Sequence, residues 1–116
     1  MLEIFVYGSL KKGQSAEHLL ESSEFVKTTA TAAQYALYIF ETYPALVPGQ
    51  KAIHGEVYRI DKSVLTTLDE YEDAPNTYVR TKIELSDGSS ILAYCLHPDH
   101  VANATKTDFT DWAELN

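Results

Sequence analysis

The sequence lacks the features of several large classes of protein. It has one cysteine, Cys95, which excludes an intrachain disulfide and fits a reducing compartment. No apolar run approaches the ~18 residues of a membrane span, and the start MLEIFVYG has no basic region or long apolar region of a secretion signal. Basic residues are scarce, at 9 against 17 acidic ones, which argues against nucleic-acid phosphates as a partner. We therefore expect a cytoplasmic protein with no membrane or nucleic-acid partner.

The residues that are present have the composition of one globular domain. Apolar residues make up 45% of the chain and charged residues 22%, an ordinary balance for a protein of 116 residues with one core. Runs of β-favouring residues predict strands at 2–7, 35–40, 52–60, 77–85 and 90–97, of which the last two form a hairpin. We expect residues 1–116 to fold as a single α+β domain whose strands curl into a small barrel.

Short helices are expected among these strands. They are predicted at 16–22, at 61–73 and after Asp108, where a last helix would dock Phe109 and Trp112. The segment ETYPALVPGQ, residues 41–50, contains two prolines and a glycine and is expected to be a turn-rich connection.

The stretch VYGSLKKGQS, residues 6–15, spaces Gly8 and Gly13 as a nucleotide-binding P-loop does. Gln14 occupies the position of the P-loop lysine, and a neutral amide cannot neutralise a triphosphate. The P-loop fold also needs several βα units of ~30 residues, for which this chain has little room. The pattern therefore favours a different use for this loop, which leaves the end of a strand.

One acidic residue of the predicted helix 61–73 stands near its apolar face. At ~100° per residue, that face is formed by Val64, Leu65, Leu68 and Tyr71. Glu72 lies about 50° from the middle of the face, whereas Glu70 points nearly the opposite way. Partial burial and the negative end of the helix dipole both raise the pKa of a carboxyl group there, which suits a general base that returns its proton. The alternative is a helix that ends before Glu72 and leaves it in solvent, and the pattern does not separate the two.

Other candidate sites are weaker. His97-Pro98-Asp99-His100 gathers two histidines and an acid, but the proline breaks helical spacing, so a solvated loop is favoured over a metal site. Ser9 lacks the G-x-S-x-G surroundings of a nucleophile. Tyr78 and Arg80 share one face of a strand and either line a wet site or form outer surface.

Two segments together resemble a known family. They are VYGSLKKGQ and GEVYRIDKSVLTTLDEYEDAPNTYVR, and they carry Y-G-[ST]-L-[KR]-x-G, G-E-[VL]-Y, L-D-x-x-E and Y-x-R in order. This series resembles the gamma-glutamylcyclotransferase-like superfamily, most closely its gamma-glutamylamine cyclotransferase branch. The resemblance covers nearly the whole chain.

The resemblance implies a small mixed β-barrel of about five to seven strands with short peripheral helices. It implies that Glu72 transfers protons and that Tyr7, Gly8, Ser9 and Leu10 bind the glutamyl group of a small γ-glutamyl substrate, which is cleaved without a cofactor or metal to 5-oxoproline and a free amine. Many members have glycine where this chain has Asp73, which either raises the pKa of Glu72 further or faces water. The alternative is a non-catalytic module that binds a carboxylate ligand or a protein partner in the same pocket.

Overall fold

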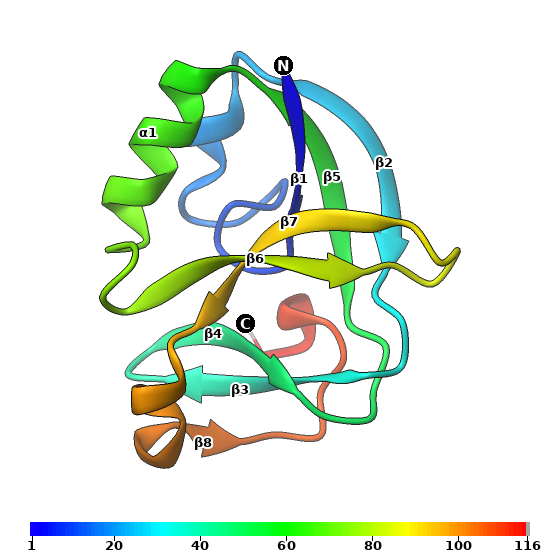
Figure 1. Cartoon of the computed structure of the whole chain (residues 1–116), viewed down its shortest axis with the longest axis vertical. Coiled ribbons are helices and arrows are strands. Elements are labelled where there is room, and N and C mark those ends of the chain that lie inside the picture. The colour runs from blue at the N-terminus through cyan, green and yellow to red at the C-terminus, as the bar shows by residue number, and fades with distance from the viewer. Residues whose placement is uncertain (116) are drawn as a thin grey trace.

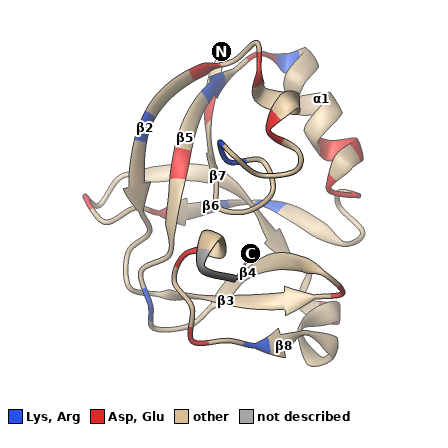
Figure 2. Ribbon diagram, turned by 180° about the vertical axis from the view of Figure 1, so that it is seen from behind, with Lys and Arg blue, Asp and Glu red and all other residues tan. Residues whose placement is uncertain are grey.

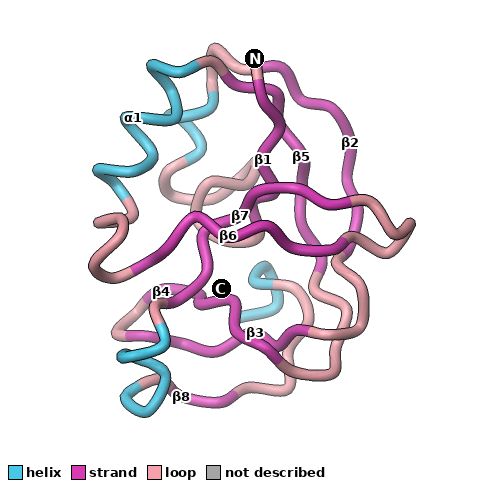
Figure 3. The backbone as a smooth tube through the Cα atoms, viewed as in Figure 1, coloured by secondary structure: helices cyan, strands magenta, loops and turns pink. Residues whose placement is uncertain are grey.

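Eight strands pair into one mixed sheet in a computed structural model that describes residues 1–115, with side chains for residues 1–113 (Figure 1). The strands are β1 (Leu2–Val6), β2 (Glu24–Ala30), β3 (Tyr35–Phe40), β4 (Tyr43–Pro48), β5 (His54–Ile60), β6 (Tyr78–Glu84), β7 (Ser90–Leu96) and β8 (Thr105–Lys106). The helix α1 (Lys62–Tyr71) and the 3-10 turn η2 (Pro98–Asn103) lie at the periphery (Figure 3), and two further 3-10 turns are η1 (Glu17–Leu20) and η3 (Trp112–Leu115).

The sheet runs in the order β2-β5-β1-β7-β4-β3-β8, and β6 pairs with β7 outside this path. β1 and β4 are both parallel to β7, whereas the pairs β1/β5, β2/β5, β3/β4 and β6/β7 are antiparallel. A bridge between Thr31 and Leu85 joins the chain after β2 to the chain after β6 and curls the sheet. The mixed half-barrel with one main helix confirms the expected α+β class.

A fork in the sheet lies beside β7. Its residues Leu92 and Ala93 pair with β1, and two residues later Cys95 pairs with Leu46 of β4. Tyr7, which follows β1, reaches across this fork. Its hydroxyl donates a hydrogen bond to the Tyr94 carbonyl oxygen at 2.6 Å and accepts one from the Leu46 N–H at 3.1 Å. The side chain thus satisfies main-chain groups where the strands separate.

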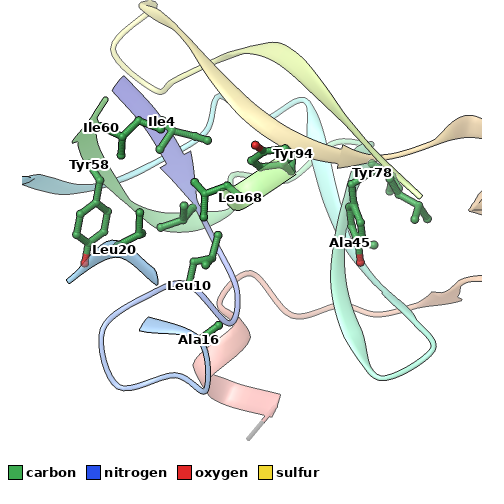
Figure 4. Packing of buried hydrophobic residues seen from close by; sticks show 13 residues of the cluster. Ile4, Leu10, Ala16, Leu20, Ala45, Tyr58, Ile60, Leu68, Tyr78 and Tyr94 are labelled. Carbon is green, nitrogen blue, oxygen red and sulfur yellow. The ribbon is translucent and has the colours of Figure 1, made fainter. Parts of the chain in front are cut away.

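Helix α1 begins as the sequence predicts. The Asp61 carboxylate caps it, because Oδ1 accepts a hydrogen bond from the Val64 N–H at 2.9 Å. Leu68 is fully buried and packs into a core cluster with Ile4, Leu10 and Leu20, so the apolar face of α1 covers this side of the sheet (Figure 4). The burial of Leu68 therefore holds the C-terminal end of α1 against the core.

The five expected strands are confirmed to within two residues at each end, but the assignment of 41–50 is wrong, because it contains β4. The prolines are tolerated because Pro44 and Pro48 lie near the two ends of that strand. The sequence also gave no sign of β2 or β8. The helix at 16–22 is only the 3-10 turn η1. In the last turn Trp112 is buried as expected, but Phe109 is 38% exposed, and Asp111 rather than Asp108 accepts the N–H of Ala113.

No helix in the described part of the chain is both long enough and apolar enough to cross a bilayer.

Candidate functional site

A cavity of about 300 Å³ opens beside the fork, between the end of β1, the β3–β4 turn and the end of α1. Its deep wall is buried and consists largely of aromatic and apolar side chains, including Tyr7, Leu10, Pro44, Tyr78 and Tyr94. We call this space the substrate cavity. Its outer edge, here called the rim, is formed by the exposed residues Glu41, Tyr43, Tyr71 and Asp73.

Glu72 lines the substrate cavity although α1 ends at Tyr71. The Asp73 N–H bonds the Glu70 carbonyl at 3.2 Å, and the Ala74 N–H bonds the Asp69 carbonyl at 2.9 Å. These two bonds form a Schellman turn, in which Asp73 takes the left-handed conformation with φ of 51°. Both readings of the sequence were thus partly right: the helix has ended at Glu72, but the turn keeps this side chain partly buried instead of releasing it to solvent.

Burial raises the pKa of the Glu72 carboxyl group to about 7. Among the residues whose side chains are described, none donates a hydrogen bond to this carboxylate or forms a salt bridge with it. The charge acts on the surrounding wall: the pKa of Tyr7 and the pKa of Tyr78 are raised first by burial and then by Glu72. A carboxyl group that titrates near neutrality can both accept and donate a proton.

Asp69, one helical turn before Glu72, is placed differently. Its Oδ1 accepts a hydrogen bond from the Tyr94 hydroxyl at 2.6 Å and lies 3.2 Å from Nε of Arg80. Burial, followed by this bond to Asp69, raises the pKa of Tyr94. Arg80 therefore forms a salt bridge with Asp69 of α1 and does not line the cavity. Tyr78, on the same face of β6, does line it. The acidic positions of α1 gather toward its C-terminal end (Figure 2).

The loop Tyr7 to Leu10 forms the opposite part of the cavity lining. Tyr7 contributes its ring, because its hydroxyl is occupied by main-chain groups. In the described part of the chain no acceptor is found for the backbone N–H groups of Gly8, Ser9 and Leu10. A Cβ at Gly8 would lie 2.3 Å from Cγ of Pro44, so only glycine allows this approach of the loop to β4. Ser9 Oγ lies 2.8 Å from the Tyr71 hydroxyl and links the loop to α1.

The β3–β4 turn supplies the part of the site that the sequence did not resolve. Glu41, Tyr43 and Pro44 of this segment line the cavity, whereas no described residue of the tail after β8 does. Glu41 begins the two-residue turn between Phe40 and Tyr43 with φ of 58°. The short spacing between an aromatic strand and Pro44 was the available signal for this hairpin.

Of the remaining sequence candidates, the histidine segment and Cys95 fall outside the cavity, whereas Asp73 lies on its rim. In the His97 to His100 segment, His97 Nδ1 accepts a hydrogen bond from the Asp99 N–H at 3.1 Å, and no group of three or more His, Cys, Asp or Glu side chains within the described residues is placed to hold a metal. The Asp73 carboxylate accepts a hydrogen bond from the Thr77 hydroxyl at 2.7 Å, and it is not a cause of the raised pKa of Glu72. Burial raises the pKa of the Cys95 thiol to about 11, which keeps this thiol protonated and unreactive near neutral pH.

Comparison with known proteins matches residues 4–114 to the family model described as gamma-glutamyl cyclotransferase, AIG2-like. The chain is 37% identical over 89 residues to the gamma-glutamylcyclotransferase family protein YtfP of Escherichia coli strain K12, which covers 77% of this chain and 78% of that protein. It is 39% identical over 94 residues to gamma-glutamylaminecyclotransferase A of Danio rerio, covering 72% of this chain and 58% of that protein.

The fold is also similar to the crystal structure of an AIG2-like protein from Mus musculus. The TM-score is 0.72 and the identity 30%, and the match covers 85% of this chain and 81% of that one. The matched model, the curated relatives and the fold agree with the motifs read from the sequence. The chain belongs to the gamma-glutamyl cyclotransferase, AIG2-like family.

Proposed function

We propose that the protein is a cyclotransferase that converts a γ-glutamyl amine or γ-glutamyl amino acid to 5-oxoproline and a free amine, with Glu72 as the general base and acid. The observation that carries the proposal is the carboxyl group of Glu72, which lines a cavity without a partner among the described residues and has a pKa of about 7. A small γ-glutamyl substrate, the absence of a cofactor requirement and a cytoplasmic location belong to the same proposal.

The reaction needs little beyond proton transfer. The substrate holds its own nucleophile, because the α-nitrogen can attack the γ-carbonyl carbon and close a five-membered ring with a large effective molarity. The new C–N bond forms and the bond to the leaving nitrogen breaks. The α-ammonium loses two protons over the reaction and the leaving nitrogen gains two, so the amine departs as an ammonium and no water is consumed. Glu72 carries protons between the two nitrogens.

The loop supplies the complementary half of the site. The backbone N–H groups of Gly8, Ser9 and Leu10 have no acceptor in the described part of the chain, so they are available to the substrate's carboxylate and to the oxyanion that forms at the γ-carbon. Donors on main chain are already oriented before the substrate binds. Removal of one such donor typically costs about 10²-fold or more in rate.

A non-catalytic module that recognises a carboxylate ligand or a partner loop is the second candidate. The same N–H groups would serve it. It gains nothing from Glu72, because a carboxyl group inside a carboxylate-binding pocket repels the ligand when ionised. The partial burial of Glu72 therefore favours the enzyme.

Product analysis with a Glu72→Gln variant tests the proposal. Wild type incubated with γ-glutamyl amines and amino acids in H₂¹⁸O should release 5-oxoproline without ¹⁸O, whereas hydrolysis would yield labelled glutamate. Glu72→Gln keeps the shape of the side chain and should lower kcat by about 10²- to 10⁴-fold.

Glu70→Gln is the matched control, because Glu70 lies exposed on the same helix and does not line the cavity. It should keep the wild-type rate. Equal rates for Glu72→Gln and wild type would show that Glu72 is not the base. Binding of γ-glutamyl compounds by wild type without any turnover would favour the binding module.

A further inference from the structure

Tyr94 lies where the two halves of the substrate cavity meet. It lines the cavity, and on β7 it stands between Ala93, which pairs with β1, and Cys95, which pairs with β4. The loop after β1 forms one side of the cavity, and Glu72 after α1 lies on the other. A residue that is bonded to both sides sets the distance between them.

The main chain of Tyr94 holds the loop side. Its carbonyl oxygen accepts the hydrogen bond of the Tyr7 hydroxyl at 2.6 Å, and Tyr7 is the first residue of the loop. Both residues are buried, where a hydrogen bond is stronger than in water. The start of the loop is therefore fixed to β7 by a group that no substitution of the Tyr94 side chain removes.

The side chain of Tyr94 holds the helix side. Its hydroxyl donates a hydrogen bond to Oδ1 of Asp69 at 2.6 Å, and Asp69 lies one helical turn before Glu72. Arg80 stands directly opposite Tyr94 in the pairing of β6 with β7, and its Nε lies 3.2 Å from the same oxygen. Side chains that face each other across two strands are close neighbours. The end of α1 is therefore attached through one carboxylate to a pair of residues in the sheet.

Asp69 and Leu68 together prevent the end of α1 from turning. Leu68 is fully buried in the core cluster that also contains Tyr94 (Figure 4). Within residues 1–113, whose side chains are described, Asp69 makes the only polar contacts between a side chain of α1 and a strand. An apolar contact alone is not directional, but two successive residues point ~100° apart around a helix. Contacts at both therefore fix the rotation of the last turn, and with it the direction in which Glu72 points.

We propose that Asp69, Arg80 and Tyr94 form a brace that holds Glu72 at the working distance from the loop donors, and that they act on the reaction through Glu72. This inference rests on the proposed function and adds positioning residues to it. A base must lie within about 2.6–3.2 Å of the nitrogen whose proton it takes, and a misplacement of ~1 Å costs about 10²-fold in rate. Because the loop stays attached to the Tyr94 carbonyl, loss of the brace should affect kcat more than KM.

Tyr94→Phe removes the hydroxyl of the brace, and Tyr58→Phe is the matched control. Tyr58 is also a buried strand tyrosine, its hydroxyl donates to the Glu56 carboxylate at 3.1 Å, and it does not line the cavity. Both variants lose one bond to a carboxylate, so urea unfolding should show similar losses of stability. We expect kcat to fall about tenfold in Tyr94→Phe, with KM changed less than about twofold, and to stay at the wild-type value in Tyr58→Phe. Equal kcat in the two variants would overturn the inference.

Two substitutions of Asp69 separate the bond from the charge. Asp69→Asn keeps an oxygen that accepts the Tyr94 hydroxyl, whereas Asp69→Ala removes it. We expect Asp69→Ala to lower kcat about tenfold, as Tyr94→Phe does, and Asp69→Asn to lie within about threefold of the wild type. The double variant of Asp69→Ala and Tyr94→Phe should lose no more than either one, because both break the same bond. Losses that multiply in the double variant, or equal losses in Asp69→Asn and Asp69→Ala, would contradict the brace.

The background of Glu72→Gln shows whether the brace acts through the base. With Glu72 replaced, no carboxylate is left to position, so adding Tyr94→Phe should lower the residual rate less than about twofold. A contact of Tyr94 with the substrate, or a general loss of structure, would lower the rate as much in this background as in the wild type. That result would overturn the inference and leave Glu72 as the base.

Amide hydrogen exchange tests the brace without any substrate. The N–H groups of Glu72 and Ala74 close the end of α1 with bonds of 2.9 Å, and the Leu65 N–H closes its first turn with a bond of 3.1 Å. Tyr94→Phe should speed exchange at Glu72 and Ala74 about tenfold relative to Leu65, because only the end of α1 is released. An unchanged ratio would overturn the inference. If the wild type yields no 5-oxoproline from any γ-glutamyl compound, the proposed function is wrong, and this ratio still decides whether the three residues hold the end of α1.

Discussion

The substrate cavity and a second concavity border the same loop but treat their charges in opposite ways. The second concavity is lined by Lys11, Thr28, Thr29, Ala30, His54, Gly55, Glu56, Ser86 and Asp111. Here Lys11 Nζ lies 2.7 Å from Asp111 Oδ1, and Glu56 accepts hydrogen bonds from the Lys12 N–H and the Tyr58 hydroxyl. In the substrate cavity, by contrast, Glu72 has no partner within the described residues.

The two concavities therefore differ in what their polar groups contribute: in the second concavity they stabilise the fold, and in the substrate cavity they are available for chemistry. Paired charges hold the second half of the loop, Lys11 and Lys12, against β5 and the tail, and they leave little capacity for a ligand. In the first half of the loop, the backbone N–H groups of Gly8, Ser9 and Leu10 have no acceptor in the described part of the chain. They cost folding free energy, because a buried polar group without a partner is unfavourable. A bound substrate can recover that cost. We therefore expect changes in the cavity to affect catalysis most and changes in the second concavity to affect stability most.

Among changes in the loop, the largest effect should come from Gly8→Ala. The added Cβ would meet Pro44 Cγ at 2.3 Å, so the loop must move away from β4 and misplace its N–H groups. We expect kcat/KM to fall about 10²-fold, since a shift of ~1 Å in positioning groups costs that much. Gly13→Ala is the control in the same loop, because Gly13 has φ of 82° but open space around it, and it should cost stability with little loss of rate. Retained activity in Gly8→Ala would show that the loop position is not critical.

The next largest effect should be on the free energy of unfolding. We expect Glu72→Gln to be more stable than the wild type, by an amount that depends on pH. The unfolded carboxyl group titrates near 4.5 and the folded one near 7, so the wild type loses stability relative to the variant as pH rises from 4.5 to 7. A shift of this size corresponds to about 3 kcal/mol above pH 7. Urea unfolding at pH 5, 6, 7 and 8 measures the difference between the two proteins. A difference that is constant over this range would contradict the raised pKa of Glu72.

A smaller loss of stability is expected when the second concavity is broken. Asp111→Asn removes the negative charge that neutralises the buried Lys11 ammonium 2.7 Å away and leaves only an amide oxygen as acceptor, which should lower the free energy of unfolding by about 1–2 kcal/mol. The value of kcat/KM should change less than about threefold, because Asp111 does not line the substrate cavity. Asp108→Asn is the control: its pair with Lys51 is exposed, and such pairs contribute ~0–1 kcal/mol. A loss of rate without a loss of stability would reverse the assignment of the two regions.

The smallest effect should follow from Ser9→Ala. The variant removes the bond to the Tyr71 hydroxyl but keeps the backbone N–H, so kcat/KM should fall less than about fivefold. Tyr71→Phe should have a similar effect, and the double variant should add little. A 100-fold loss in Ser9→Ala alone would mean that the hydroxyl, rather than the main chain, acts on the substrate.

The parts of the fold that local pattern determines were predictable. The alternation of 77–85 and 90–97 identified β6 and β7, and the helical period of 61–73 placed Glu72 near the core. Local pattern failed where the environment overrides it. Pro44 and Pro48 disguise β4, and the charged residues and the register shift of the edge strand β2 obscure its alternation.

Two acids near the C-terminal end of α1, Asp69 and Glu72, show the same limit within the site. Nothing in the helix itself distinguishes Asp69, which is paired, from Glu72, which has no partner within the described residues, because the partners of Asp69 are Arg80 on β6 and Tyr94 on β7. The helical period and the resemblance together predicted a role for Glu72, and the left-handed turn at Asp73 orients its side chain.

The fork beside β7 has a consequence for how such a site can change. A strand has only two edges, and β6 occupies one edge of β7 along its whole length, so β1 and β4 must divide the other. Two strands that share an edge end to end must diverge from it, and the opening between them is therefore imposed by the path of the chain. We therefore expect substitutions on the rim to leave the opening itself in place, because Tyr7 bridges it through main-chain hydrogen bonds without a contribution from a ligand.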